Sequence, residues 1–133
     1  MGYPVGLVDL NVYIPEGFMS SQEIAAATGI PVDVIERKFG LKGKHIAAPD
    51  EHVSDLAVKA ARPLLEKVPP ENIDAVIYFG SPLKDYQVWL CAPKIQQELG
   101  AVKAYSFELC GVSAGFPIAL KVARDMLVAD GGI

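Results

Sequence analysis

The sequence is poor in cysteine, histidine and positive charge. Two cysteines, Cys91 and Cys110, and two histidines occur in its 133 residues. Two cysteines are too few for a disulfide-stapled secreted scaffold, and no CxxC pair offers a metal site, so we expect no bound metal. The formal net charge of −4 argues against a nucleic-acid-binding surface as the main function.

Long hydrophobic runs are missing as well. The longest apolar stretch without charge, residues 109–120, has 12 residues. A membrane-spanning helix needs about 20. The first residues, MGYPVGLVDLNVYIP, lack the basic region and long apolar stretch of a secretory signal. We therefore expect a soluble, cytoplasmic protein with no membrane partner.

The composition that remains is that of a folded domain. Hydrophobic residues make up 51% of the chain and charged residues 21%, which is enough for a substantial core. The length suggests one compact unit, residues 1–133.

Apolar periodicity and turn residues indicate alternating strands and helices. Buried strands are expected at residues 4–13, 74–80 and 102–109, with a short extended piece at 41–47. Helices are expected at residues 20–28, 31–40, from 54 with a bend at Pro63, 92–100 and 114–130. This order predicts an α/β fold with a mixed or parallel sheet.

The stretch FELCGVSAGF, residues 107–116, carries the most chemical information. A strand ends there and a long apolar helix begins, so free helix N–H groups favour negative charge at this point. Ser113 and Cys110 are the two candidate nucleophiles. Cysteine is the better nucleophile by chemistry, although Cys110 also fits a small buried hydrophobe. Ser113 equally fits a plain helix cap.

Charged residues elsewhere offer weaker candidates. A basic cluster indicates either a phosphate-binding patch or a solvated face, and comprises Arg37, Lys38, Lys42 and Lys44. Lys84 and Asp85 resemble ordinary surface charge.

Several segments together resemble β-ketoacyl-acyl-carrier-protein synthase III and related thiolase-superfamily enzymes, including hydroxymethylglutaryl-CoA synthase. The similar segments are residues 5–25 (VGLVDLNVYIPEGFMSSQEIA), 39–51 (FGLKGKHIAAPDE), 72–77 (NIDAVI) and 95–101 (IQQELGA). Their order and spacing follow the N-terminal half of the family. The resemblance implies a thiolase-like α/β domain, a mixed sheet with helices on its faces in βαβαβ order. It is incomplete relative to the family's duplicated fold.

The resemblance also implies an activity. The family pattern is Phe-Asp, four further residues, then Cys-x-Gly-Phe, and counting from Phe107 places Ser113 at the position of the acyl-accepting cysteine. A serine there needs a base to accept an acyl group. The family's catalytic histidine and asparagine lie in its second half, so we expect these 133 residues alone to be inactive. We also expect the Ser113 hydroxyl to lie at the mouth of a cavity.

Substrates and partners follow from the same resemblance. The substrate is expected to be an acyl-CoA thioester, with acyl carrier protein as partner in fatty-acid or polyketide-type synthesis and with no separate cofactor. Residues expected at the substrate are Arg37, Lys38, Val88, Gly115 and Phe116. A homodimer is expected through the strand at 102–109. The alternatives are a non-catalytic relative used in binding or assembly, a hydroxymethylglutaryl-CoA synthase-like enzyme, or an unrelated α/β binding domain.

Overall fold

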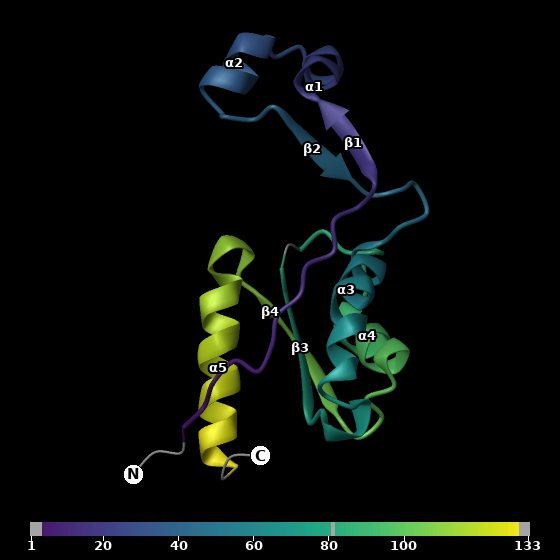
Figure 1. Ribbon diagram of the computed structural model, residues 1–133, viewed down its shortest axis with the longest axis vertical. Coiled ribbons are helices and arrows are strands. Elements are labelled where there is room, and N and C mark those ends of the chain that lie inside the picture. Colours follow the sequence, from purple (N-terminus) through teal and green to yellow (C-terminus); the bar gives the residue numbers. More distant parts are fainter. Residues whose placement is uncertain (1–3, 81, 131–133) are drawn as a thin grey trace. The chain divides into compact units, whose positions relative to one another are not determined.

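The structure, a computed structural model, describes residues 4–80 and 82–130 and divides them into two compact units (Figure 1). The larger unit joins residues 4–12 to residues 52–130, and the smaller is Tyr13–Glu51. The length suggests one compact unit, and the structure divides the chain into two because residues 13–51 pair and pack among themselves, with their own strand pair and helices.

The larger unit has a parallel strand pair between helical layers. β3 (Ala75–Gly80) pairs with β4 (Tyr105–Cys110), in a register that runs from Ala75 opposite Tyr105 to Gly80 opposite Cys110. Figure 1 shows α5 (Gly115–Ala129) on one face of this pair, with α3 (Val53–Ala61) and α4 (Cys91–Leu99) on the other. The α/β class and the helices on both faces are as predicted.

The core of this unit lies between α3, α4 and the strands. Val58, Cys91, Ile95 and Leu99 are buried there, and Val76 and Tyr78 of β3 pack against them. The helix ends follow the sequence signals. Gly100 adopts φ +74° and ends α4, while Pro63 converts the end of α3 into the 3-10 helix Arg62–Glu66. A second 3-10 turn, Pro70–Asn72, precedes β3.

The predicted strand at residues 4–13 is wrong. Residues 4–12 form no strand ladder, and Leu7, Val8 and Leu10 are each more than 70% exposed. The segment is held by side chains instead, because the Asn11 Nδ2 donates to the Ala60 carbonyl (2.9 Å) and the Asp9 carboxylate lies 2.8 Å from the Lys67 Nζ. Its β-branched pattern is that of a strand, but the described chain supplies no strand beside it.

The smaller unit is an antiparallel pair with two short helices. β1 (Gly17–Ser20) pairs with β2 (Gly43–Ile46), and α1 (Ser21–Thr28) and α2 (Val32–Arg37) lie between them in sequence. The predicted capping box is confirmed: the Glu23 N–H donates to the Ser20 Oγ (3.3 Å), and the Ser20 N–H donates to the Glu23 carboxylate (2.7 Å). Ile24 and Ile35 are buried. β1 was not predicted.

None of the helices within residues 4–80 and 82–130 is long and apolar enough to cross a bilayer.

Candidate active site and its supports

The junction between β4 and α5 is a tight turn built on glycine. β4 ends at Cys110, and the 3-10 turn Val112–Ala114 leads into α5. A Cβ on Gly111 would lie 3.0 Å from both the Cα and the N of Gly115, and a Cβ on Gly115 would lie 3.3 Å from the Phe79 ring. A side chain at either position would have to push its neighbours apart by a few tenths of an ångström, so glycine suits this close approach over the end of β3.

The backbone of this turn is strained at one position. Val112 has φ +44°, the left-handed region, which a β-branched residue rarely adopts. It is the only non-glycine residue with positive φ in the described part of the chain. Strain of this kind gathers at functional sites. Val112 lies immediately before Ser113, so its backbone conformation sets the direction of the chain at Ser113.

Ser113 lies where the sequence placed it, between β4 and α5, but its surroundings differ from expectation. The N-cap of α5 is Ala114, with no side-chain cap, so the interpretation of Ser113 as a helix cap is wrong. Ser113 is exposed and lines none of the three cavities described for the larger unit. The cavity expected at its hydroxyl is not one of these three, and among the described residues no side chain hydrogen-bonds to Ser113.

The neighbouring thiols have different environments. Cys110 is exposed at the end of β4. Cys91 is fully buried at the start of α4, where burial, aided by the Asp85 carboxylate, raises the pKa of its thiol. A raised pKa keeps the Cys91 thiol protonated, which makes it a packing residue.

Lys84 and Glu108 form a buried ion pair, which overturns the interpretation of Lys84 as surface charge. Their side chains are 13% and 6% exposed. The Glu108 carboxylate also accepts from the N–H groups of Cys91 and Ala92 (3.2 Å for Ala92), so β4 caps the N-terminus of α4. The Lys84 Nζ additionally donates to the Trp89 carbonyl (3.3 Å), and its bond to Glu108 raises the Lys84 pKa.

Asp85 is equally engaged. Its carboxylate accepts from the Ser54 N–H (3.0 Å) and from the Ser54 hydroxyl, and so caps α3 from the β3–α4 loop. Burial alone would raise the Asp85 pKa, but the Ser54 hydrogen bonds and the nearby Lys94 charge outweigh burial and lower it. Ser54 is completely buried.

Lys94 completes this network. Its Nζ donates to the Ser54 Oγ (2.7 Å) and the Asp55 carboxylate (2.5 Å). The Asp55 hydrogen bond raises the Lys94 pKa, and the same bond lowers the Asp55 pKa. The network fixes the β3–α4 loop to both helices.

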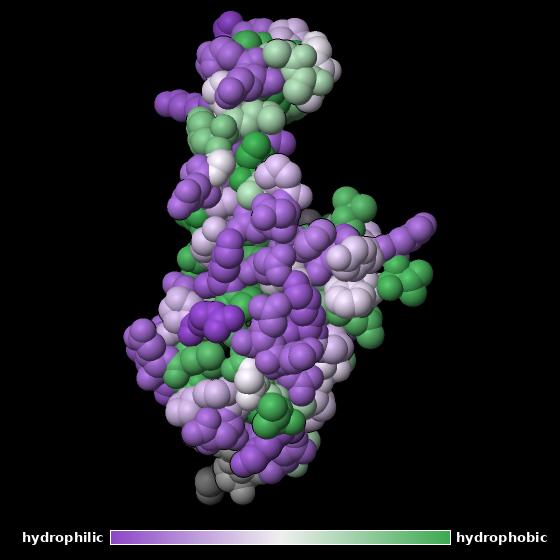
Figure 2. Space-filling model, turned by 90° about the vertical axis from the view of Figure 1, so that its right-hand side faces the viewer, coloured by the Kyte–Doolittle hydropathy of each residue, from purple (hydrophilic) through white to green (hydrophobic). Residues whose placement is uncertain are grey.

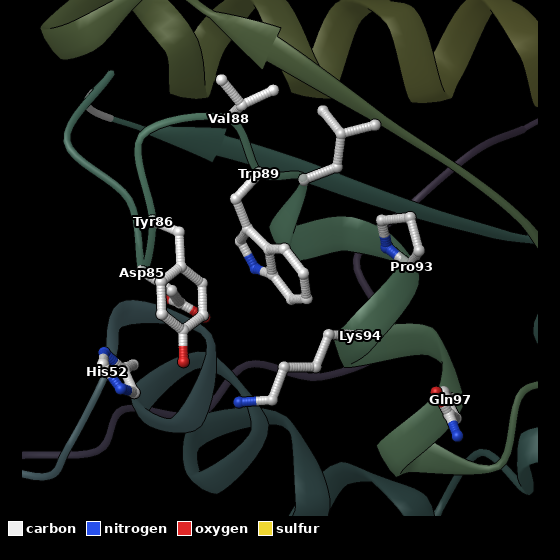
Figure 3. A pocket seen from close by; sticks show the side chains of 9 residues that line it. His52, Asp85, Tyr86, Val88, Trp89, Pro93, Lys94 and Gln97 are labelled. Atoms are coloured by element: carbon white, nitrogen blue, oxygen red, sulfur yellow. The ribbon is translucent and has the colours of Figure 1, made fainter.

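A cavity of about 730 Å³ lies beside this network. Figure 3 shows Tyr86 and Trp89 projecting into it from the β3–α4 loop, with His52 from the start of α3 and Pro93, Lys94 and Gln97 from α4. Val88, one of the predicted substrate residues, lines it and is 95% exposed. On the side of the molecule that carries α3 and α4, hydrophilic residues dominate the surface of the larger unit, with apolar residues protruding at one edge (Figure 2).

The other predicted substrate residues divide between the units. Gly115 is buried at the start of α5, and Phe116 is half exposed, with its ring 5.4 Å from that of Phe79. Arg37 and Lys38 end α2 in the smaller unit, where Arg37 pairs with Asp33 at 3.8 Å. The structure therefore brings Ser113, Gly115 and Phe116 together in one unit, while Arg37 and Lys38 belong to the other.

The two networks were missed at the sequence level. Glu108 stands in a strand whose other side chains are mostly apolar, and a charge at such a position signals a buried partner. That partner, Lys84, lies 24 residues away in sequence.

Known proteins are similar to this chain in sequence. The chain is 32% identical over 128 residues to an acetoacetyl-CoA synthase of Streptomyces sp. (strain CL190). The alignment covers 95% of this chain and 39% of that protein. It is 31% identical over 117 residues to the β-ketoacyl-[acyl-carrier-protein] synthase III of Lactococcus lactis subsp. cremoris. That alignment covers 86% of this chain and 35% of that protein. No protein-family model matches the sequence.

Solved structures agree. The synthase III of Thermus thermophilus superposes with a TM-score of 0.81 at 32% identity, over 96% of this chain and 39% of that one. In sequence and in fold the chain is similar to β-ketoacyl synthase III and its thiolase-like relatives. A priming β-ketosynthase of the R1128 polyketide pathway superposes equally well, at 28% identity. The resemblance and the fold class stated from the sequence are thus confirmed, and the chain spans under two fifths of the length of these synthase III relatives.

Proposed function

We propose that this chain carries the acyl-accepting position, Ser113, of a synthase III-type acyltransferase. The observation that supports it most is the similarity along 95% of the chain to an acetoacetyl-CoA synthase, combined with Ser113 at the β4–α5 turn. The strained Val112 and the close glycines describe a turn whose conformation is imposed. The substrate class is an acyl-CoA thioester, with acyl carrier protein as the second partner in fatty-acid or polyketide-type synthesis, in the cytoplasm.

We propose that the 133 residues alone do not catalyse acyl transfer, for a chemical reason. The serine oxygen forms a bond to the thioester carbonyl, the bond to the CoA sulfur breaks, and the hydroxyl proton has to pass to a base. Within the described residues no base is hydrogen-bonded to Ser113, and an unassisted hydroxyl is a poor nucleophile at neutral pH. Arg37 and Lys38 would meet the CoA phosphates, and Val88, Gly115 and Phe116 would contact the substrate.

A homodimer fits this proposal. β4 pairs on one side with β3, and its other edge has no partner strand in the described residues. An open strand edge recruits a second strand, here that of a second copy. Sedimentation velocity should give a dimer, and a monomer at all concentrations would refute this part.

The experiment compares the chain with Ser113→Cys and Ser113→Ala after incubation with radiolabelled acetyl-CoA. We expect no label on the wild-type chain. A thiol beside the helix N-terminus ionises near neutral pH and needs no base, so Ser113→Cys should form a thioester that hydroxylamine removes. Ser113→Ala should stay unlabelled. Failure of Ser113→Cys to take label, with its fold intact by circular dichroism, would refute the proposal.

A non-catalytic relative is the second candidate. The serine in place of cysteine favours it, as does the exposure of that serine with no base hydrogen-bonded to it among residues 4–80 and 82–130. Under this candidate, acyl-CoA binds reversibly and neither cysteine nor serine at position 113 becomes acylated. A hydroxymethylglutaryl-CoA synthase-like activity is the remaining alternative within the same resemblance.

A further inference from the structure

The side chain of Phe79 lies against the first turn of α5. Phe79 is the penultimate residue of β3, opposite Leu109 of β4, and it points to the face of the strand pair that α5 covers (Figure 1). A Cβ on Gly115, the first residue of α5, would lie 3.3 Å from the Phe79 Cδ2 and 3.4 Å from the Phe79 Cβ. The Phe116 ring lies beside it, with ring centroids 5.4 Å apart. The helix therefore begins in contact with a side chain of the neighbouring strand.

The start of the β4–α5 turn lies against the same glycine. A Cβ on Gly111 would lie 3.0 Å from the Cα and the N of Gly115, and the Ala114 N–H donates to the Gly111 carbonyl (2.9 Å). Gly115 is thus bounded by Gly111 within the turn and by Phe79 across the sheet. Position 113 lies between the two ends of this turn.

Packing, rather than side-chain hydrogen bonding, holds the turn. No side chain caps α5, and among residues 4–80 and 82–130 none hydrogen-bonds to Ser113. Val112 nevertheless keeps φ +44°, and a strained conformation persists only where its surroundings impose it. The contact of Phe79 with Gly115 supplies part of that constraint from another strand.

We propose that Phe79 is a positioning residue for acyl transfer at position 113 and that it acts through Gly115. The proposal rests on the proposed function of Ser113. Phe79 fixes the first turn of α5, and so sets where the side chain at position 113 lies relative to the N–H groups at the start of that helix. Those N–H groups favour the negative charge of the attacking atom and of the oxyanion that forms from the thioester carbonyl.

The test uses the chain with Ser113→Cys and Cys110→Ser, in which the remaining native thiol, Cys91, is fully buried. Phe79→Ala removes the Cδ2 atom nearest Gly115, so thioester formation with acetyl-CoA should slow about 3- to 10-fold at saturation. The half-saturating concentration of acetyl-CoA should stay the same, because Phe79 does not contact the substrate. Phe79→Leu keeps both a Cβ and Cδ atoms and should keep the rate.

Phe107→Ala is the matched control. Phe107 is an aromatic residue of β4 on the same face of the strand pair, stacked on Tyr105 with ring centroids 6.3 Å apart, and Tyr105 reaches Met126 of α5. Its loss should lower stability without changing acyl labelling. Circular dichroism checks that each variant is folded. If Phe79→Ala is unfolded, Phe79→Val, which also lacks Cδ atoms, takes its place with the same expectations.

The pH profile of alkylation by iodoacetamide separates this proposal from the proposed function, because it needs no acyl-CoA. Phe79→Ala should raise the pH midpoint for alkylation at position 113, since the thiolate loses its place beside the helix N-terminus. Phe79→Leu and Phe107→Ala should leave the midpoint unchanged. A raised midpoint in Phe79→Ala without acetyl label in any variant would support the positioning role and refute the proposed function. An unchanged midpoint in the folded Phe79 variant, or an equal shift in Phe107→Ala, would overturn the positioning role.

Discussion

Two turns follow the carboxyl ends of the paired strands, and they are stabilised in opposite ways. The β3–α4 loop is fixed by side-chain charge, through Lys84 to Glu108 and through Asp85 to Ser54. The β4–α5 turn depends instead on the close approach of Gly111 to Gly115 and on a strained Val112. The first arrangement gives stability, whereas the second leaves a polar side chain, Ser113, available for chemistry.

The largest effect should come from Glu108→Ala. It removes the cap of α4 and leaves the Lys84 ammonium without its ion-pair partner, so the free energy of unfolding should fall more than in any other variant considered below. Urea unfolding followed by Trp89 fluorescence measures it. Glu66→Ala, an exposed position, is the control and should stay within about 0.5 kcal/mol of wild type. Equal losses for both variants would show that the loop is not fixed by the pair.

Gly111→Ala should lower the free energy of unfolding by less than Glu108→Ala does, but it should change the β4–α5 turn more. The new methyl group meets backbone atoms of Gly115 at 3.0 Å, and such overpacking costs about 1–3 kcal/mol. Ser113 is two residues further along the same turn. Gly111→Ala in the Ser113→Cys background should therefore reduce acyl labelling at position 113. Gly6→Ala, whose methyl group meets nothing within 4 Å, is the matched control. Unchanged labelling in Gly111→Ala would contradict the steric account.

A smaller effect should appear with pH. The pKa values of Asp85 and Asp55 are lower in the folded protein than in the unfolded chain. Their contribution to stability is therefore complete above the unfolded pKa, about 4, and is lost as the pH falls below it. Ser54→Ala removes the hydroxyl that bonds Asp85, so its free energy of unfolding should fall less between pH 5 and 3 than that of wild type. A steeper fall in Ser54→Ala would reverse the assigned sign.

Ser113→Ala should have the smallest effect. The hydroxyl is exposed and does not cap α5, so the free energy of unfolding should change by less than about 0.5 kcal/mol. Thermal or urea unfolding measures it. A loss of about 1 kcal/mol or more would restore the helix-cap interpretation.

Local signals in the sequence predicted local structure well. The Ser20–Glu23 capping box, the left-handed Gly100 and the bend at Pro63 each depend on neighbours within a few residues, and all three are found. The family was also predictable, because the similar segments follow one another along the chain in the order and spacing of the synthase III N-terminal half.

Features that depend on distant partners were not predictable in this way. The apolar pattern of residues 4–13 does not say whether a neighbouring strand exists, and none in the described chain pairs with it. The partners of Lys84 and Asp85 lie 24 and 31 residues away in sequence. The residues next to Lys84 and Asp85 therefore did not indicate that either side chain has a fixed partner. The position of Ser113 was predicted, but its exposure depends on what packs over the turn.

Peptide mapping of the acylated protein tests the central claim most directly. Ser113→Cys is combined with Cys110→Ser, incubated with acetyl-CoA, digested and analysed by mass spectrometry. The account predicts one acetyl group, on the peptide that contains position 113. An acetyl group on Cys110 of the wild-type chain would contradict it. So would the absence of an acetyl group at position 113 of the folded double variant.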